Sequence, residues 1–142
     1  MPQVMQTITT TAATTLTFGN HAETIVVLNS TTGRILTLPA SAGTGKKFHI
    51  YVSATVSSGN HVIAVANATD IMCGGVSIST DIAGVTCLAT ATDDTITMTG
   101  STTGGVKGSV VHLTDVVSGQ WNVEGFLVST GSEATPFSAA VS

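Results

Sequence analysis

Hydrophobic and polar positions alternate along much of this chain with a period of two. The alternation is clearest in three segments, whose inward residues are Phe48, Ile50 and Val52; Ile96 and Met98; and Trp121, Val123 and Gly125. A period of two predicts half-buried β-strands. No window repeats apolar residues at helical spacing over three turns, so we expect no helix.

Further strands are expected where short runs of β-branched and apolar residues lie between Gly-rich turns. These runs are 24–29, 34–38, 62–66, 75–79, 84–89 and 108–113. Short strands that recur about every 8–12 residues are typical of sandwiches and barrels. The sequence therefore predicts an all-β fold, a β-sandwich or barrel of short antiparallel strands.

A weak internal repeat relates two parts of the chain at an offset of 60 residues. Residues 34–63 align without gaps to residues 94–123, with identical residues at seven of thirty positions. The repeat suggests an internal duplication in which a unit of three strands is used twice.

The two ends differ from the middle of the chain. Residues 1–20 are rich in Thr and Ala, and 132–142 have a similar character with Pro136. We expect an extended N-terminal arm (1–20), a β-domain (21–131) and an extended tail (132–142). The arm is expected to gain order by pairing with a neighbouring subunit, and a frayed terminus is the alternative. The candidate contacts with a subunit or capsid are Val4, Met5, Thr7, Ile8 and Thr9.

Charge is scarce: 8% of the residues are charged and the formal net charge is −4, where a soluble domain usually has about 25%. A neutral surface rich in hydroxyl groups is poorly protected against association. It predicts a chain largely covered by other subunits, the alternative being a well-hydrated monomer.

Four Lys and Arg residues against eight Asp and Glu argue against nucleic-acid binding. No apolar run is long enough to span a membrane, and the start has no signal-peptide pattern, so we expect folding in the cytoplasm.

Candidate chemistry is sparse. Residues 40–47, Ala-Ser-Ala-Gly-Thr-Gly-Lys-Lys, nearly match a phosphate-binding loop, but Ala40 replaces the first Gly and Lys47 replaces the final Ser or Thr. We interpret this segment as a flexible turn that enters a strand. Trp121 is expected to anchor the core, with a ligand-stacking platform as the alternative.

No metal or catalytic site is expected. The four histidines, expected at the surface or at strand edges, have no metal-ligand spacing, and Asp81, Asp93 and Asp94 lack calcium-loop spacing. Cys73 and Cys87 are expected to be small buried hydrophobes, with a cross-strand disulfide as the alternative. We therefore predict no enzyme activity, no catalytic residues, no cofactor and no metal.

An ordered series of segments resembles small structural proteins of bacteriophages. The segments are 34–40 (Arg-Ile-Leu-Thr-Leu-Pro-Ala), 43–52, 70–75 (Asp-Ile-Met-Cys-Gly-Gly), 107–113 and 119–125 (Gly-Gln-Trp-Asn-Val-Glu-Gly). They resemble the "TLPA", "D.I.GG" and "G.W.V.G" segments of capsid decoration (cement) proteins and of related phage fibre modules. The resemblance implies an all-β, commonly trimeric module on the outer surface of the virion. One departure is Asp115, which lies six residues before Trp121 instead of beside the Gly.

The function that we expect is capsid decoration: a homo-oligomer, a trimer by the resemblance, that binds the major capsid protein on the assembled head and stabilises it. The alternative is a tail- or head-fibre module that binds a host receptor, for which Tyr51 and Phe126 are the candidate exposed aromatics. A hydrolase would require a reactive serine and a pocket, and the sequence indicates neither.

Overall fold

The computed structural model describes residues 7–9 and 13–141. Within these residues the chain forms twelve strands and one short helix. In chain order they are β1 (Thr7–Thr9), β2 (Thr14–Thr15), α1 (Phe18–His21), β3 (Ile25–Leu28), β4 (Ile35–Thr37), β5 (Lys47–Val52), β6 (His61–Ala64), β7 (Ile71–Ser79), β8 (Gly84–Leu88), β9 (Thr95–Met98), β10 (Val110–Val117), β11 (Gln120–Val128) and β12 (Phe137–Ser138).

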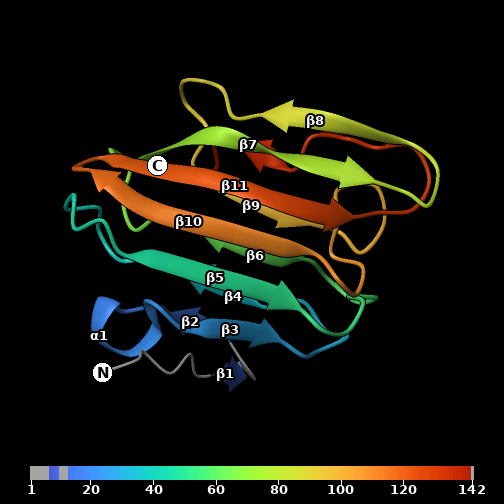
Figure 1. Cartoon of the computed structure of the whole chain (residues 1–142), viewed down its shortest axis with the longest axis horizontal. Coiled ribbons are helices and arrows are strands. Elements are labelled where there is room, and N and C mark those ends of the chain that lie inside the picture. Colours follow the sequence, from blue (N-terminus) through green and yellow to red (C-terminus); the bar gives the residue numbers. More distant parts are fainter. Residues whose placement is uncertain (1–6, 10–12, 142) are drawn as a thin grey trace.

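The strands form two sheets, which Figure 1 shows as two layers, one in front of the other. The seven-stranded sheet has the order β1-β3-β5-β10-β11-β7-β8, and the five-stranded sheet has the order β12-β9-β6-β4-β2. The prediction of an all-β fold is confirmed. The barrel alternative is wrong, because each sheet begins and ends at an edge strand and neither closes on itself.

Both sheets are mixed, whereas the sequence had led us to expect antiparallel strands. The pairs β1–β3, β3–β5 and β7–β11 in one sheet, and β2–β4 and β4–β6 in the other, are parallel. From β3 to β6 the chain changes sheet after every strand. Strands that follow one another therefore lie in different layers, and every second strand returns to the same layer with the same direction. Hydrophobic alternation reports which face is buried and carries no information on strand direction, which is why the sequence missed this.

One hydrophobic cluster joins the two sheets. Its members come from the alternating positions on both, including Phe48 and Ile50 of β5, Ile96 of β9 and Val123 of β11. Trp121 is completely buried, as predicted. Its ring lies 5.7 Å from that of Phe48, in an edge-to-face arrangement that is favourable for aromatic pairs.

Part of the predicted arm belongs to this core. Leu16 is completely buried, and Phe18 packs its ring against Phe48 (5.8 Å) and Trp121 (6.2 Å). Phe18 begins α1, which the sequence did not predict; Thr17 caps this helix by accepting a hydrogen bond from the Asn20 N–H at 3.2 Å. Single large residues among Thr and Ala form no periodic pattern, so the sequence could not show that Leu16 and Phe18 pack against the core.

The candidate contact residues of the arm are divided. Thr7, Ile8 and Thr9 form β1, which pairs in parallel with β3 at one edge of the seven-stranded sheet. Val4 and Met5 lie outside the described residues. In the predicted tail, Phe137 is buried and β12 pairs with β9.

The internal repeat corresponds to a structural similarity over two of its three strands. The first strand of each unit (β4 and β9) lies in the five-stranded sheet, and the second (β5 and β10) lies in the seven-stranded sheet. The third strands separate: β6 stays in the five-stranded sheet, and β11 joins the seven-stranded one. The residues aligned at the start of these third strands, His61 and Trp121, are both completely buried.

Replacement of Leu16 by Ala tests whether the segment before α1 is structural. We expect the free energy of unfolding to fall by about 3 kcal/mol, because the substitution leaves a cavity in the core. Urea denaturation measures this change. Thr15→Ala is the matched control, since Thr15 is the exposed neighbour of Leu16 in sequence, and it should change the free energy by less than about 0.5 kcal/mol. Equal effects of the two substitutions would contradict the burial of Leu16.

Candidate functional site

The segment that resembles a phosphate-binding loop surrounds a carboxylate of the protein itself. Asp115, completely buried in β10, points its side chain into the turn formed by residues 41–44. Its Oδ1 accepts hydrogen bonds from Ser41 Oγ (2.7 Å) and Gly43 N (3.0 Å), and its Oδ2 from Thr44 N (2.9 Å) and Thr44 Oγ1 (2.8 Å). The N–H of Ala42 lies 3.1 and 3.2 Å from the two oxygens. The loop is thus a nest of donors for an anion, and Asp115 occupies it.

Two effects of opposite sign act on the pKa of Asp115. Burial is the larger single effect and raises the pKa, but the hydrogen bonds from Thr44, Ser41 and Gly43 together outweigh it and lower the pKa to about 2. The carboxylate is therefore charged in the folded protein. It connects the crossover between β4 and β5 to the end of β10, where a β-bulge at Val116 interrupts the pairing with β11. The predicted turn before β5 is thus a bend whose N–H and hydroxyl groups are hydrogen-bonded to Asp115.

The histidines occupy three kinds of position. His61 is completely buried, and its Nδ1 accepts the N–H of Arg34 at 3.0 Å; the expectation of a surface or strand-edge residue was wrong here. The sequence held a signal for this burial: in the alternating pattern His61 falls on the same face as Ile63 and Val65, and both of these residues are buried too. His21 lies in α1, and its Nδ1 accepts the N–H of Thr17 at 3.0 Å.

His49 and His112 are paired on the outer face of the seven-stranded sheet. They are directly opposite in the antiparallel register of β5 and β10. Their Nε2 atoms are 3.3 Å apart and their ring centroids 4.1 Å apart. Burial lowers the pKa of His49, and the nearby His112 and Lys47 lower it further. Sequence spacing could not reveal the pair, because 63 residues separate the two histidines.

The two cysteines are free and partly buried. They lie on the adjacent strands β7 and β8, but Cys87 is opposite Val76, three residues from Cys73. The disulfide alternative is therefore not realised, and the expected full burial is realised only in part.

The aspartates considered for calcium serve the local structure. Asp93 accepts the N–H of Thr90 at 2.7 Å, and Asp94 accepts the N–H of Ala140 at 2.8 Å, which holds the tail on the fold. Across residues 7–9 and 13–141, no three His, Cys, Asp or Glu side chains are grouped so that they could hold a metal ion.

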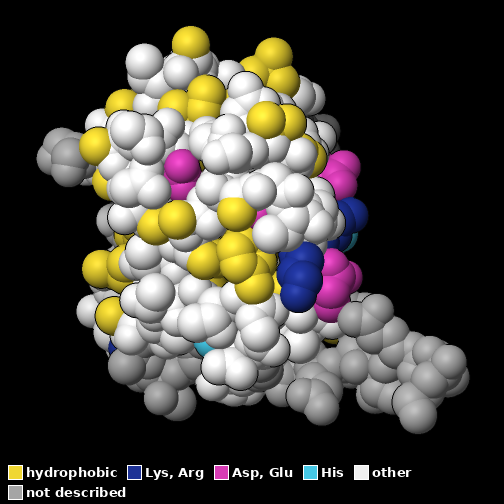
Figure 2. Space-filling model, turned by 90° about the vertical axis from the view of Figure 1, so that its left-hand side faces the viewer, with side chains coloured by type: hydrophobic (Ala, Val, Ile, Leu, Met, Phe, Trp, Pro, Cys, Tyr) yellow, Lys and Arg dark blue, Asp and Glu magenta, His cyan; other side chains and the backbone are white. Residues whose placement is uncertain are grey.

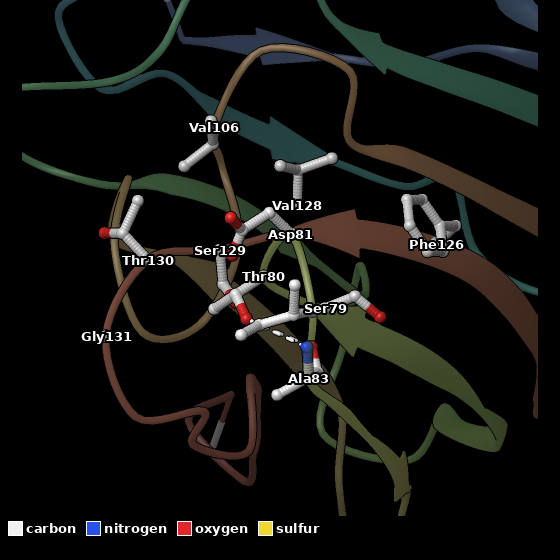
Figure 3. A pocket seen from close by; sticks show the side chains of 11 residues that line it. Ser79, Thr80, Asp81, Ala83, Val106, Phe126, Val128, Ser129, Thr130 and Gly131 are labelled. Atoms are coloured by element: carbon white, nitrogen blue, oxygen red, sulfur yellow. Dashed lines mark hydrogen bonds between the residues drawn. The ribbon is translucent and has the colours of Figure 1, made fainter.

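The β7–β8 hairpin forms one wall of a cleft of about 750 Å³. Figure 3 shows that the hairpin turn faces the end of β11 and the segment after it. Its turn is closed by a hydrogen bond from the Ala83 N–H to Thr80 Oγ1 at 3.3 Å. The side chain of Ile82 at this turn is 92% exposed, and that of Phe126 on the opposite wall is 47% exposed. The cleft therefore presents apolar groups to solvent.

The strand that follows this turn, β8, is a free edge of the seven-stranded sheet. It pairs with β7 on one side only, has no charged residue, and exposes 69% of Leu88. Natural proteins usually protect such an edge with charges, a proline or a covering segment, because unpaired backbone groups recruit other strands. Uncharged side chains also predominate on the side of the molecule in Figure 2, where most of the charged side chains lie toward the right-hand margin and an acidic one lies in the upper left.

Tyr51 and Phe126 lie in one cross-strand row on the outer face of the same sheet. Val110 of β10 is opposite Tyr51 on one side and opposite Phe126 on the other. The row is apolar, and it ends at the cleft, which Phe126 lines.

Comparison with protein-family models, with curated proteins and with solved structures finds no match to this chain. In the part of the chain that the structure describes, no helix has the length and apolar character needed to cross a membrane.

Replacement of Asp115 by Asn tests the carboxylate in the loop. A carboxylate whose pKa is about 2 in the folded protein and near 3.9 in the unfolded chain contributes about 2–3 kcal/mol at neutral pH. We expect Asp115→Asn to lose at least this amount at pH 7 in urea denaturation. The wild-type stability from this group is present above pH 4 and is lost as the pH falls through 2, because the unfolded state binds the proton first.

The control is Asp81→Asn, which removes the same charge from an exposed position. It should change the free energy of unfolding by less than about 0.5 kcal/mol. If Asp115→Asn is as stable as this control at pH 7, the loop does not depend on the carboxylate.

Proposed function

We propose that this chain is a bacteriophage capsid decoration (cement) protein that binds the outer surface of the assembled head and stabilises it. The observation that carries the proposal is the unprotected edge at β8. Free backbone groups occur at this edge together with the exposed apolar side chains of Ile82 and Leu88, and an open apolar cleft lies beside it. A chain that stayed alone in solution would gain nothing from such an edge and would be at risk of aggregation.

The chemistry of the edge defines the partner that it fits. Since Gly84–Leu88 holds no charge, the partner is a neutral extended segment that adds a strand to β8 and places apolar side chains in the cleft. In the proposed function this segment belongs to the major capsid protein. The resemblance of the chain to phage head proteins supports that assignment.

Self-assembly is the second part of the proposal. In this proposal the two layers pack as the sandwich that the strand spacing suggested, and copies join as the trimer that the resemblance implies. β1 lies at the edge of the seven-stranded sheet opposite β8, and its residues Thr7, Ile8 and Thr9, with Val4 and Met5, are the proposed contacts with the next subunit or with the shell. With β8 left for the capsid segment, β1 is proposed to contact a different surface of the neighbouring copy, a heterologous contact of the kind that can close into a ring. The proposed location is the surface of the virion, and no reaction is assigned to the protein.

Co-sedimentation with heads of the same virus that lack the protein tests the proposed function and the role of the edge. We expect the wild-type chain to sediment with the heads at a fixed copy number. The double variant Ile82→Lys, Leu88→Lys should lose at least about tenfold in affinity, because two lysines at the edge oppose strand addition.

The matched control carries two lysines at exposed loop positions outside the edge, Thr31→Lys and Ser57→Lys. It should bind as the wild type does. Heads that fail to bind the wild-type chain would contradict the decoration function, and equal binding by the edge variant would contradict the role of β8.

Removal of residues 1–9 tests the N-terminal contacts without disturbing Leu16. We expect the truncated chain to stay folded by circular dichroism, since its core residues from Leu16 onward remain. It should lose binding to heads or dissociate from the trimer, as read by sedimentation velocity. Undiminished binding together with an unchanged oligomer would contradict the role assigned to the arm.

The alternative function, a fibre module that binds a host receptor, is favoured by one observation. The aromatic row of Tyr51 and Phe126 is partly exposed and leads into the cleft, as a platform for a sugar ring would. A trimer that ignores heads but binds glycans on an array would support this function in place of decoration.

A further inference from the structure

The two paired histidines hold the donor atoms that a transition-metal ion requires. His49 and His112 project from β5 and β10, which lie near the middle of the seven-stranded sheet (Figure 1). Their Nε2 atoms approach to 3.3 Å on the outer face, and both side chains are only partly buried. The pair is therefore accessible to an ion from solvent.

The separation of the two nitrogens fits tetrahedral coordination. Zinc binds histidine nitrogen at about 2.0–2.1 Å. Two nitrogens at 3.3 Å that share an ion at this distance subtend an angle of about 107° at the metal, close to that of a tetrahedron. The cross-strand register places the two residues opposite each other. The rings, whose centroids lie 4.1 Å apart, must rotate away from each other so that the lone pairs of both Nε2 atoms point at one ion.

A carboxylate lies next in the same row. Glu124 of β11 is directly opposite His112 on the side away from His49. Directly opposite side chains have their Cβ atoms about 5 Å apart. In the structure Glu124 Oε1 is 3.9 Å from Lys47 Nζ, and both side chains are well exposed, so this ion pair is weak. Glu124 is thus free to turn toward an ion held by the histidines.

We propose that His49 and His112 form a binding site for a divalent transition-metal ion of the zinc class. Glu124 supplies a third ligand or neutralising charge, and water or a group from a partner completes the coordination. Two His nitrogens and one carboxylate are a donor set that such ions accept. Because no group of three donors is preformed among the described residues, the ion binds more weakly than in a structural zinc site and can exchange. The site does not depend on the proposed function in capsid decoration.

Isothermal titration of the full chain with zinc chloride at pH 7.5 tests the proposal. We expect one ion per chain, and a loss of affinity of at least about tenfold in each of His49→Ala and His112→Ala. Glu124→Gln should weaken binding by a smaller factor, since it removes a charge but neither imidazole.

His21→Ala is the control, because His21 is a histidine outside the pair and should leave zinc binding unchanged. Thermal melts without metal establish that each variant is folded. Binding by the wild type that is lost in both pair variants and retained in the control supports the site. Absence of zinc binding by the wild type, or equal binding by all the variants, overturns the proposal and leaves the pair as a hydrogen bond between two imidazoles.

Discussion

The bend at residues 41–44 depends on one buried charge. Here the chain leaves the five-stranded sheet after β4 and enters the seven-stranded sheet at β5. Asp115 supplies the acceptor atoms for three backbone N–H groups and two hydroxyls of this bend. Burying an isolated carboxylate is very unfavourable, and burying a turn with unpaired N–H groups is unfavourable too. Here the N–H groups of the turn donate hydrogen bonds to the carboxylate, so that neither group is left unpaired. The crossover of the chain between its two layers is thereby tied to the strand that β5 pairs with.

The crossover pattern also determines what the surface looks like. Because strands from β3 to β6 alternate between the layers, the sheets acquire parallel pairs, and among the described strands each sheet begins and ends at an edge strand. Few charged residues are available to protect these edges, since the hydroxyl-rich composition leaves most exposed positions neutral. Neutral edges with exposed apolar groups favour association, and this physical property is the basis of the proposed assembly function.

The outer face of the seven-stranded sheet holds two chemically different rows. One row is apolar and passes through Tyr51, Val110 and Phe126, while the next passes through His49, His112 and Glu124. The first suits contact with an apolar or ring-shaped partner, and the second suits an ion. Both rows cross β5, β10 and β11, so they are products of strand register and not of any local motif.

The sequence by itself determined the class of the fold and much of its core. Alternation placed Phe48, Ile50, Ile96 and Trp121 inside, because a period of two assigns side chains to faces without reference to the rest of the chain. The composition likewise indicated a neutral surface. These properties depend on local pattern, and local pattern is what a single sequence displays.

Only the tertiary structure decided strand direction, the burial of Leu16, the contact of Asp115 with the 41–44 loop and the pairing of the two histidines. Asp115 and the loop at 41–44 are more than 70 residues apart, and the two paired histidines are 63 residues apart. The meeting of such groups depends on sheet order and register, which result from packing the whole core at once. No spacing rule in the chain encodes that outcome, so a loop that resembled a phosphate site proved to hold a carboxylate of its own protein.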